Sequence, residues 1–248
     1  MHAIFSRRIV RTSGLNVAVH TKPLTRFLVL TFRQACYRKH SMSEPAYFFL
    51  GTITTGGYDI MYYHASPIGG IQQLEPRVSN HNIPLIYFSK KRENTLVYLS
   101  NAIEKYCKDT GFDYQGTWQK WGPYGFDEDG ILRLEEYYPN ALEETYKGVS
   151  GYIYQVDSII DSGFEVQIPD AATSSEPVTV SGVEFVPDAY EAILLAEQDG
   201  LIRILRYENA PEAMKNWLCK VIPEEYENAS NHPEYRYFLD NKMSEYLQ

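Results

Sequence analysis

Short apolar runs, interrupted by glycine, proline or charged side chains, dominate the chain from residue 58 onward. Runs of four to eight residues that are rich in aromatic and β-branched side chains and end at Gly or Pro are typical of β-strands. Such runs predict strands at Tyr58–His64, Leu85–Ser89, Gly151–Val156, Phe164–Ile168, Val178–Val180 and Leu201–Tyr207. The sequence FDEDG predicts a hairpin turn between Trp118–Tyr124 and Ile131–Tyr137. For Ile71–Leu74 we expect only a brief turn or helix.

A helical spacing of three to four residues marks the remaining segments. Apolar side chains recur at this spacing from Leu96 to Tyr106, which predicts an amphipathic helix over Arg92–Lys108 that ends near Gly111. Further helices are predicted at Ala141–Tyr146 with Asn140 as its cap, at Asp188–Glu197 after Pro187, and at Pro211–Val221. Strands in the middle with helices around them indicate one α+β domain over residues 42–248 rather than a doubly wound sheet.

Composition supports a folded chain without naming a chemistry. The 248 residues are 44% hydrophobic and 22% charged, which is enough apolar material for a packed core. No run of about 18 apolar residues predicts a membrane span. Cys36, Cys107 and Cys219 lie too far apart for a disulfide framework or a CxxC zinc site. We therefore expect a cytoplasmic protein.

Charge separates the first 41 residues from the rest. Residues 1–41 hold eight basic residues and no acidic one, whereas the other 207 hold 15 basic and 32 acidic residues, a net charge of −17. The basic segment fits a mitochondrial transit peptide, or a wrongly assigned extension upstream of a true start at Met42, or a basic arm that binds RNA. In each case we expect it to be disordered. The acidic body argues against nucleic acid as a partner, because it repels phosphate.

The common catalytic signatures are absent from the sequence. There is no GxGxxG, no GxxxxGK[ST], no HExxH and no GxSxG, so the main Rossmann, P-loop, metalloprotease and hydrolase interpretations lose their support. No spacing of histidines predicts a metal site. Cys107 stands on the apolar face of a predicted helix, so we expect a buried, inert thiol rather than a partner for His64.

One local pattern does suggest a site. In the sequence YYHASP, His64 ends a predicted strand just before a turn, a position where a sheet fixes a side chain that a loop leaves accessible. The structural alternative is a buried histidine with one backbone hydrogen bond. The sequence IYFS at 86–89 is a second strand, which leads directly into a helix.

Taken in order, these motifs resemble the ADP-ribosyltransferase superfamily, in particular the small rifampicin ADP-ribosyltransferases, which carry a YHGT strand and a YFS-type strand. The sequences GYIY at 151–154 and SSEPV at 174–178 resemble later segments of that group. Glu136–Tyr154 is also similar to the pattern EYxxNxLEExYxGxxGYIY of a group of uncharacterised bacterial proteins, which begin with YxHxSP. The resemblance covers about residues 60–210 and implies split antiparallel β-sheets with flanking helices.

The resemblance further implies NAD⁺ as co-substrate, nicotinamide as leaving group and an acceptor of unknown identity. It assigns His64 to a ribose hydroxyl, Ser66 to the ribose or nicotinamide side and Tyr87 to stacking on nicotinamide, with Ala65 and Ser89 also in the cofactor site. His64 and Tyr87 are then expected to face one pocket. An acid would stabilise the positive charge that develops on the ribose C1. Glu176 is the first choice for this acid, and the alternatives are Asp161, Asp157 and Glu136.

A non-catalytic interaction or binding protein on the same fold is the competing hypothesis. The chain has Ala65 where the family more often has glycine, and the added Cβ would hinder close approach to the backbone. The identity of the acid is ambiguous, and the body of the chain is acidic and rich in tyrosine. These three features motivate the alternative.

Overall fold

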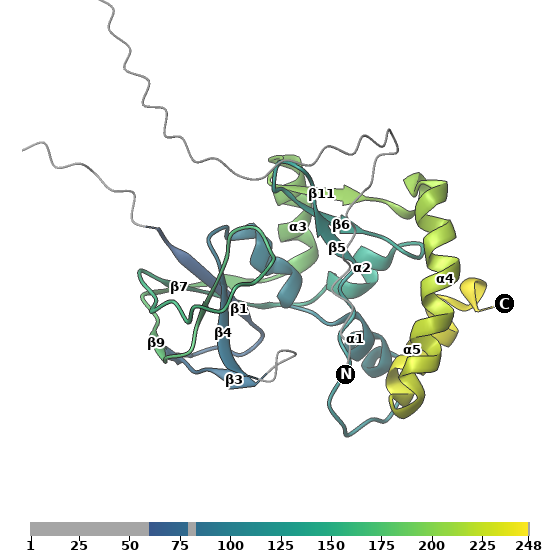
Figure 1. Cartoon of the computed structure of the whole chain (residues 1–248), viewed down its shortest axis with the longest axis horizontal. Helices are drawn as coiled ribbons and strands as arrows, with labels where there is room; N and C mark the ends of the chain where they lie inside the picture. Colours follow the sequence, from purple (N-terminus) through teal and green to yellow (C-terminus); the bar gives the residue numbers. More distant parts are fainter. Residues whose placement is uncertain (1–59, 79–82, 248) are drawn as a thin grey trace, which may run out of the picture. The chain divides into compact units, whose positions relative to one another are not determined.

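The larger β-sheet combines three strands that the apolar runs predict with three that they do not. The computed structural model describes residues 60–78 and 83–247, all within one compact unit that includes Asp59–Gln248; the basic segment 1–41 lies outside the described residues. The strand order is β10-β7-β1-β4-β3, with β8 also paired to β4, and every pairing is antiparallel (Figure 1). The strands are β1 (Tyr62–Ser66), β3 (Arg77–Val78), β4 (Pro84–Ser89), β7 (Gly151–Val156), β8 (Ala171–Ser174) and β10 (Gly182–Val186).

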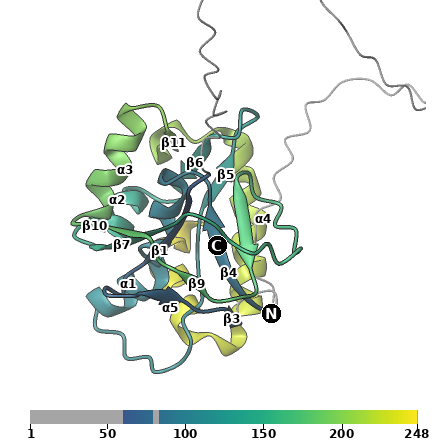
Figure 2. The same cartoon turned by 90° about the vertical axis from the view of Figure 1, so that its left-hand side faces the viewer.

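Two smaller sheets accompany the larger one (Figure 2). The predicted hairpin forms between β5 (Tyr124–Phe126) and β6 (Leu132–Glu135), which are antiparallel, and β11 (Ile202–Leu205) adds to β6 in parallel. The third sheet pairs β2 (Gln73–Leu74) with β9 (Val178–Thr179). Ile71–Leu74 thus contributes a short strand, not the brief turn or helix that we expected.

Helices flank these sheets. The α-helices are α1 (Ala102–Asp109), α2 (Ala141–Tyr146), α3 (Ala189–Gln198), α4 (Glu212–Asn228) and α5 (Pro233–Lys242). Short 3₁₀ turns are η1 (Glu93–Tyr98), η2 (Tyr207–Asn209), η3 (Ala229–Asn231) and η4 (Ser244–Tyr246). Antiparallel sheets with flanking helices agree with the predicted α+β class.

Both faces of the larger sheet are packed, each against different elements. On one face, Ala65 and Ile153 pack with Leu96 of η1 and Ile193 of α3. On the other face, Phe88 and Tyr154 pack with residues of β2 and β9. A third cluster joins α1, α4 and α5 and has no part in the sheet. The sheet is therefore the framework that positions any residue of β1 or β4.

The predicted helix over Arg92–Lys108 is two elements, because polar residues interrupt it. The chain leaves η1 after Tyr98, and Ser100 donates a hydrogen bond to the carbonyl of Thr145 at 2.6 Å. Asn101 then takes an extended conformation, and its side chain accepts a hydrogen bond from the N–H of Ile103, which begins α1. A capping residue inside an apolar period starts a new helix instead of continuing the old one.

Three other element predictions also need correction. Phe164–Ile168 is not a strand, since Asp161 and Gly163, whose φ is +72°, turn the chain, and the strand forms later as β8. Asn140 occupies the cap position of α2, but its φ is 59° and its side chain makes no capping bond. The C-terminal helix predicted to end at Val221 continues to Asn228 through Pro223. Proline removes one N–H donor, and here the rest of the helix persists.

Gly151 allows β7 to approach β1 closely, which gives a first prediction. A Cβ at this position would lie 2.6 Å from Leu99 Cδ2 and 3.2 Å from the backbone oxygen of Ser66. We expect Gly151→Ala to lower the free energy of unfolding by about 1–3 kcal/mol, because a packed core must shift. Urea denaturation followed by tryptophan fluorescence measures this change.

Gly125→Ala is the matched control, since a Cβ there would meet nothing closer than 3.8 Å. Its effect should stay within about 0.5 kcal/mol. Equal destabilisation by the two substitutions would contradict the close approach of β7 to β1.

Candidate active site

Pairing between β1 and β4 stops after a single residue pair. Tyr63 faces Ser89, and the register continues no further. On its other side, β1 pairs with β7 along its whole length, from Tyr62 to Ser66. The residues Ala65 and Ser66 of β1 therefore have no partner on β4 in the register. We name this end of β1 the pairing break.

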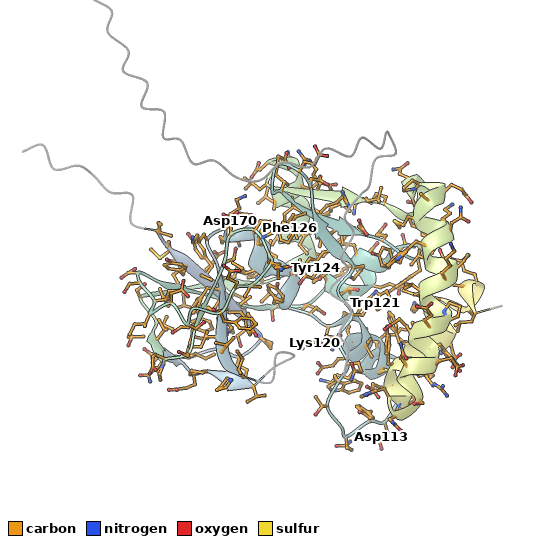
Figure 3. All side chains as sticks on the ribbon, viewed as in Figure 1. Asp113, Lys120, Trp121, Tyr124, Phe126 and Asp170 are labelled. Carbon is orange, nitrogen blue, oxygen red and sulfur yellow. The ribbon has the colours of Figure 1, made fainter. Side chains whose placement is uncertain are left out.

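Backbone hydrogen bonds show which edge of β4 faces the pairing break. Lys90 donates to the carbonyl of Asp170, on the β8 side, at 2.8 Å (Asp170 is labelled in Figure 3). Because backbone polar groups alternate along a strand, those of Tyr87 and Ser89 point the other way, toward β1. By the same alternation, the N–H and C=O of Ala65 point toward β4.

The His64 imidazole replaces the hydrogen bond that the backbone of Ala65 would form with Tyr87 if the β1–β4 ladder continued. Its Nδ1 lies 2.9 Å from the carbonyl oxygen of Tyr87. A carbonyl only accepts, so Nδ1 carries the proton and Nε2 of the neutral ring is an acceptor. Within the described residues Nε2 has no hydrogen-bond partner. The ring also meets Phe88 edge to face, with centroids 6.1 Å apart.

The electrostatic surroundings keep His64 neutral. Burial lowers its pKa below the ordinary value, the hydrogen bond that Nδ1 donates to the Tyr87 carbonyl raises it, and the positive charge of Arg77 lowers it further. The single hydrogen bond to a backbone carbonyl matches the structural alternative, although the His64 side chain is only partly buried. It also leaves the second ring nitrogen as an acceptor, which is what a hydroxyl ligand requires.

Tyr87 meets His64 through its backbone and not through its ring. Phe88 contacts His64, and neighbouring side chains of a strand leave on opposite faces. The Tyr87 ring therefore leaves β4 on the face that Ala65 and Tyr63 share, away from the imidazole. The expectation that His64 and Tyr87 point into one pocket is corrected accordingly: their side chains lie on opposite faces of the sheet.

Ser66 and Ser89 are both buried and both close local turns. Ser66 Oγ accepts a hydrogen bond from the N–H of Ile68 at 3.1 Å, and Ser89 Oγ accepts one from the N–H of Lys91 at 3.0 Å. Such side-chain turns end strands. The first shapes the chain after β1, and the second starts the turn from β4 into η1.

The sequence GYIY of β7 fixes the turn after β1. Tyr154, which pairs with His64, donates to the carbonyl of Ile68 at 2.7 Å and accepts from the N–H of Ile71 at 3.2 Å. The ring of Tyr152 lies over Gly69, where a Cβ would come within 2.7 Å of it. A motif first noted for its resemblance to a family therefore has a local structural role.

The four candidate acids have different environments. Glu136 is buried, and its carboxylate accepts from the backbone N–H groups of Leu142 and Tyr207 at 3.0 and 3.2 Å. It caps α2 in the place that we assigned to the side chain of Asn140. Two backbone bonds to one carboxylate are a structural arrangement.

The other three acids are exposed. Asp157 accepts from the hydroxyl of Ser181 at 2.8 Å, and Asp161 accepts from the N–H of Gly163 at 2.8 Å. Glu176 follows β8, and within the described residues its carboxylate has no hydrogen bond or ion pair. Glu176 is four residues, and so up to about 13 Å, from Ala172, which pairs with Phe88. The described part of the chain places no carboxylate in contact with His64.

One internal cavity among the described residues is too small for a nucleotide. It lies between β5, β6 and α2, is lined by residues such as Trp121 and Tyr124, and has room for about one water molecule (Figure 3). None of the predicted site residues lines it.

Sequence analysis missed two cations beside β1 and β4. Arg92 makes a two-pronged ion pair with Glu184 of β10, with Nε to Oε2 at 3.0 Å, and so connects the two ends of the strand row β10-β7-β1-β4. Arg77 lies on β3, paired with Leu85. No local sequence pattern marks Arg77 or Arg92, because the residues near each of them in space are set by the order of the strands in the sheet.

Comparison with known proteins finds no matching family model, no matching curated protein and no matching solved structure. The family resemblance of the motifs therefore stays a prediction. Among the described residues, no helix is long and apolar enough to cross a membrane. The same residues contain no group of three or more His, Cys, Asp or Glu side chains arranged to hold a metal ion.

The lowered pKa of His64 predicts a pH-dependent stability. Since the unfolded chain takes up the proton at a higher pH than the folded chain does, acidification below the ordinary value of 6.5 favours unfolding. We expect the free energy of unfolding to fall more between pH 7.5 and pH 5 in the wild type than in His64→Gln. Urea titrations at each pH measure the two slopes. Identical slopes would show that the imidazole does not stay neutral in the fold.

The two backbone bonds of Glu136 predict that it contributes to stability. Glu136→Ala leaves two N–H groups without their acceptor, and we expect a loss of about 2–4 kcal/mol in chemical denaturation. Glu143, which is only partly buried and forms a surface ion pair with Lys147 at the end of α2, provides the control Glu143→Ala, with a loss of about 0.5 kcal/mol or less. If the Glu136→Ala variant were as stable as the wild type, the structural role of Glu136 would be contradicted, and Glu136 would again be a candidate for the catalytic acid.

Proposed function

We propose that this chain binds NAD⁺ at the pairing break and transfers ADP-ribose to an acceptor, with release of nicotinamide, on a fold of the ADP-ribosyltransferase type. The observation that carries the proposal is the neutral His64, held by the Tyr87 carbonyl with its Nε2 left as an acceptor. The order of the motifs supports it: histidine on one strand, tyrosine on the neighbouring strand, and GYIY on the strand beyond.

The backbone at the break suits the nicotinamide end of the substrate. Ala65 would offer one N–H donor and one C=O acceptor toward β4, and a carboxamide needs one of each. His64 Nε2 would accept from a ribose hydroxyl. The Tyr87 ring lies on the face that Ala65 shares, so it would reach the nicotinamide from that side and not from the side of the imidazole.

The proposed reaction exchanges one bond at the ribose C1. The nicotinamide–ribose bond breaks and its electron pair leaves with neutral nicotinamide, while a nucleophilic atom of the acceptor bonds to C1 and gives up its proton. Positive charge accumulates on the sugar in the transition state, and a carboxylate lowers that barrier. The resemblance assigns this role to Glu176, whose carboxylate is exposed and has no hydrogen bond within the described residues.

A second function, binding without transfer, is favoured by one observation. No carboxylate of the described residues contacts His64, and Glu176 follows the end of β8, four residues and up to about 13 Å from Ala172, the partner of Phe88. A domain that held NAD⁺ or a related nucleotide without an acid near C1 would bind and not turn it over.

Titration calorimetry with NAD⁺ and chromatography of released nicotinamide separate these functions. We expect the wild type to bind NAD⁺ and His64→Ala to bind it about 10-fold more weakly or worse, because one hydrogen bond to a buried group is lost. Glu176→Gln should keep its NAD⁺ affinity and lose most nicotinamide release. Mass spectrometry of the products identifies an ADP-ribosylated acceptor or free ADP-ribose.

Lys147→Gln is the control variant, since Lys147 is an exposed residue directly after α2 and its ion pair within the described residues is with Glu143. It should match the wild type in both measurements. Binding without any nicotinamide release would favour the second function. Absence of NAD⁺ binding at millimolar concentration would exclude the transferase and would exclude NAD⁺ as the ligand of the second function.

A further inference from the structure

The pairing break has a second boundary, formed by β3. On the edge of β4 that faces β1, Ser89 pairs with Tyr63 of β1, and Leu85 pairs with Arg77 of β3. β1 and β3 thus share one edge of β4, and the stretch between them is where His64 reaches the Tyr87 carbonyl. Leu85 and Tyr87 are two residues apart, so Arg77 begins about 7 Å from the break. An arginine side chain can cover that distance.

Arg77 combines exposure with the absence of an anionic partner. It is exposed on β3, and within residues 60–78 and 83–247 it forms no ion pair. The arginines 92, 133, 203 and 206 each hold a carboxylate of the same unit. The charge of Arg77 nevertheless acts on His64, whose pKa it lowers. The guanidinium is therefore close enough to the break to influence a group bound there.

An anionic ligand needs such a cation in this protein. The 207 residues after the basic segment have a net charge of −17, which repels any molecule that carries phosphate. A guanidinium offers five donors in a planar fork, which matches two oxygens of a phosphate group. Tyrosine hydroxyls and backbone groups near the break supply no positive charge.

We propose that Arg77 binds the diphosphate of the ligand at the pairing break. This inference rests on the proposed function, because it assigns the charged middle of NAD⁺ to a residue that neither the motifs nor the resemblance identified. Because Arg77 pairs with Leu85, its side chain leaves β3 on the face of Leu85 and Tyr87, opposite the imidazole, so the diphosphate would lie on the Tyr87 face of the break. Arg77 acts as a binding residue and takes no part in the bond exchange at C1.

Calorimetry with three probes tests this role. NAD⁺ and ADP both carry a diphosphate, whereas nicotinamide riboside has the reacting end of NAD⁺ without phosphate. We expect Arg77→Gln to bind NAD⁺ and ADP about 10- to 100-fold more weakly than the wild type and to bind nicotinamide riboside with unchanged affinity. Arg77→Lys should recover part of the loss, since it keeps the charge without the fork. Raising the salt concentration should weaken the wild type more than Arg77→Gln.

Lys147→Gln removes the same charge at a remote position and should leave all three affinities unchanged. Equal NAD⁺ affinity in the wild type and Arg77→Gln would overturn the role of Arg77 and leave the proposed function standing. Binding of ADP that depends on Arg77, without nicotinamide release from NAD⁺, would support Arg77 and refute the transferase. Equal loss for nicotinamide riboside and NAD⁺ would also overturn the inference, because it would indicate a damaged fold and not a lost phosphate contact.

Discussion

The hydrogen bond between His64 Nδ1 and the Tyr87 carbonyl determines how the candidate site is built. In a regular antiparallel ladder that carbonyl would accept from the backbone of the facing residue, Ala65. The imidazole takes its place, so β1 separates from β4 after one residue pair and β3 uses the next part of the same edge. One side chain thereby satisfies a buried carbonyl, ends a ladder and turns backbone groups of β1 toward the break. It also fixes its own tautomer.

Packing around this bond makes the arrangement rigid. β7 pairs with all of β1, and its Tyr154 holds the turn that follows β1 through two hydrogen bonds. The pair of Arg92 and Glu184 connects the start of η1 to β10, across the two strands between them. A partly desolvated, two-pronged pair of this kind gains geometric specificity as well as energy. The backbone at the break is therefore held from three strands, which limits the entropy that a ligand would have to remove on binding.

Sequence reasoning predicted the strands around the candidate site better than the directions of its side chains. The strands around His64, Tyr87 and Tyr154 were predicted because aromatic runs between turns carry their own local signal. The strand β10 was missed since Val183 and Phe185 point outward and are exposed, so its pattern does not resemble that of a buried strand. Helix α5 was missed because its apolar positions lie among charged residues and tyrosines. The face on which Tyr87 leaves β4 depends on register, a long-range property that no local motif encodes.

The four candidate acids illustrate why a plausible position in sequence is weak evidence for a catalytic role. Glu136 lies in the segment that best fits the bacterial pattern, yet both of its oxygens accept backbone hydrogen bonds, so the pattern there reflects how α2 begins. Asp157 accepts a hydrogen bond from the hydroxyl of Ser181, and Asp161 holds a local turn through the N–H of Gly163. Glu176 is left with an available carboxylate because its own turn is held by Ser174, which bonds the backbone and not the acid. Glu176 is therefore the candidate acid whose carboxylate has no structural role in the described residues. Its distance from His64 decides whether it could stabilise the transition state of a transfer reaction or whether the site would only bind its ligand.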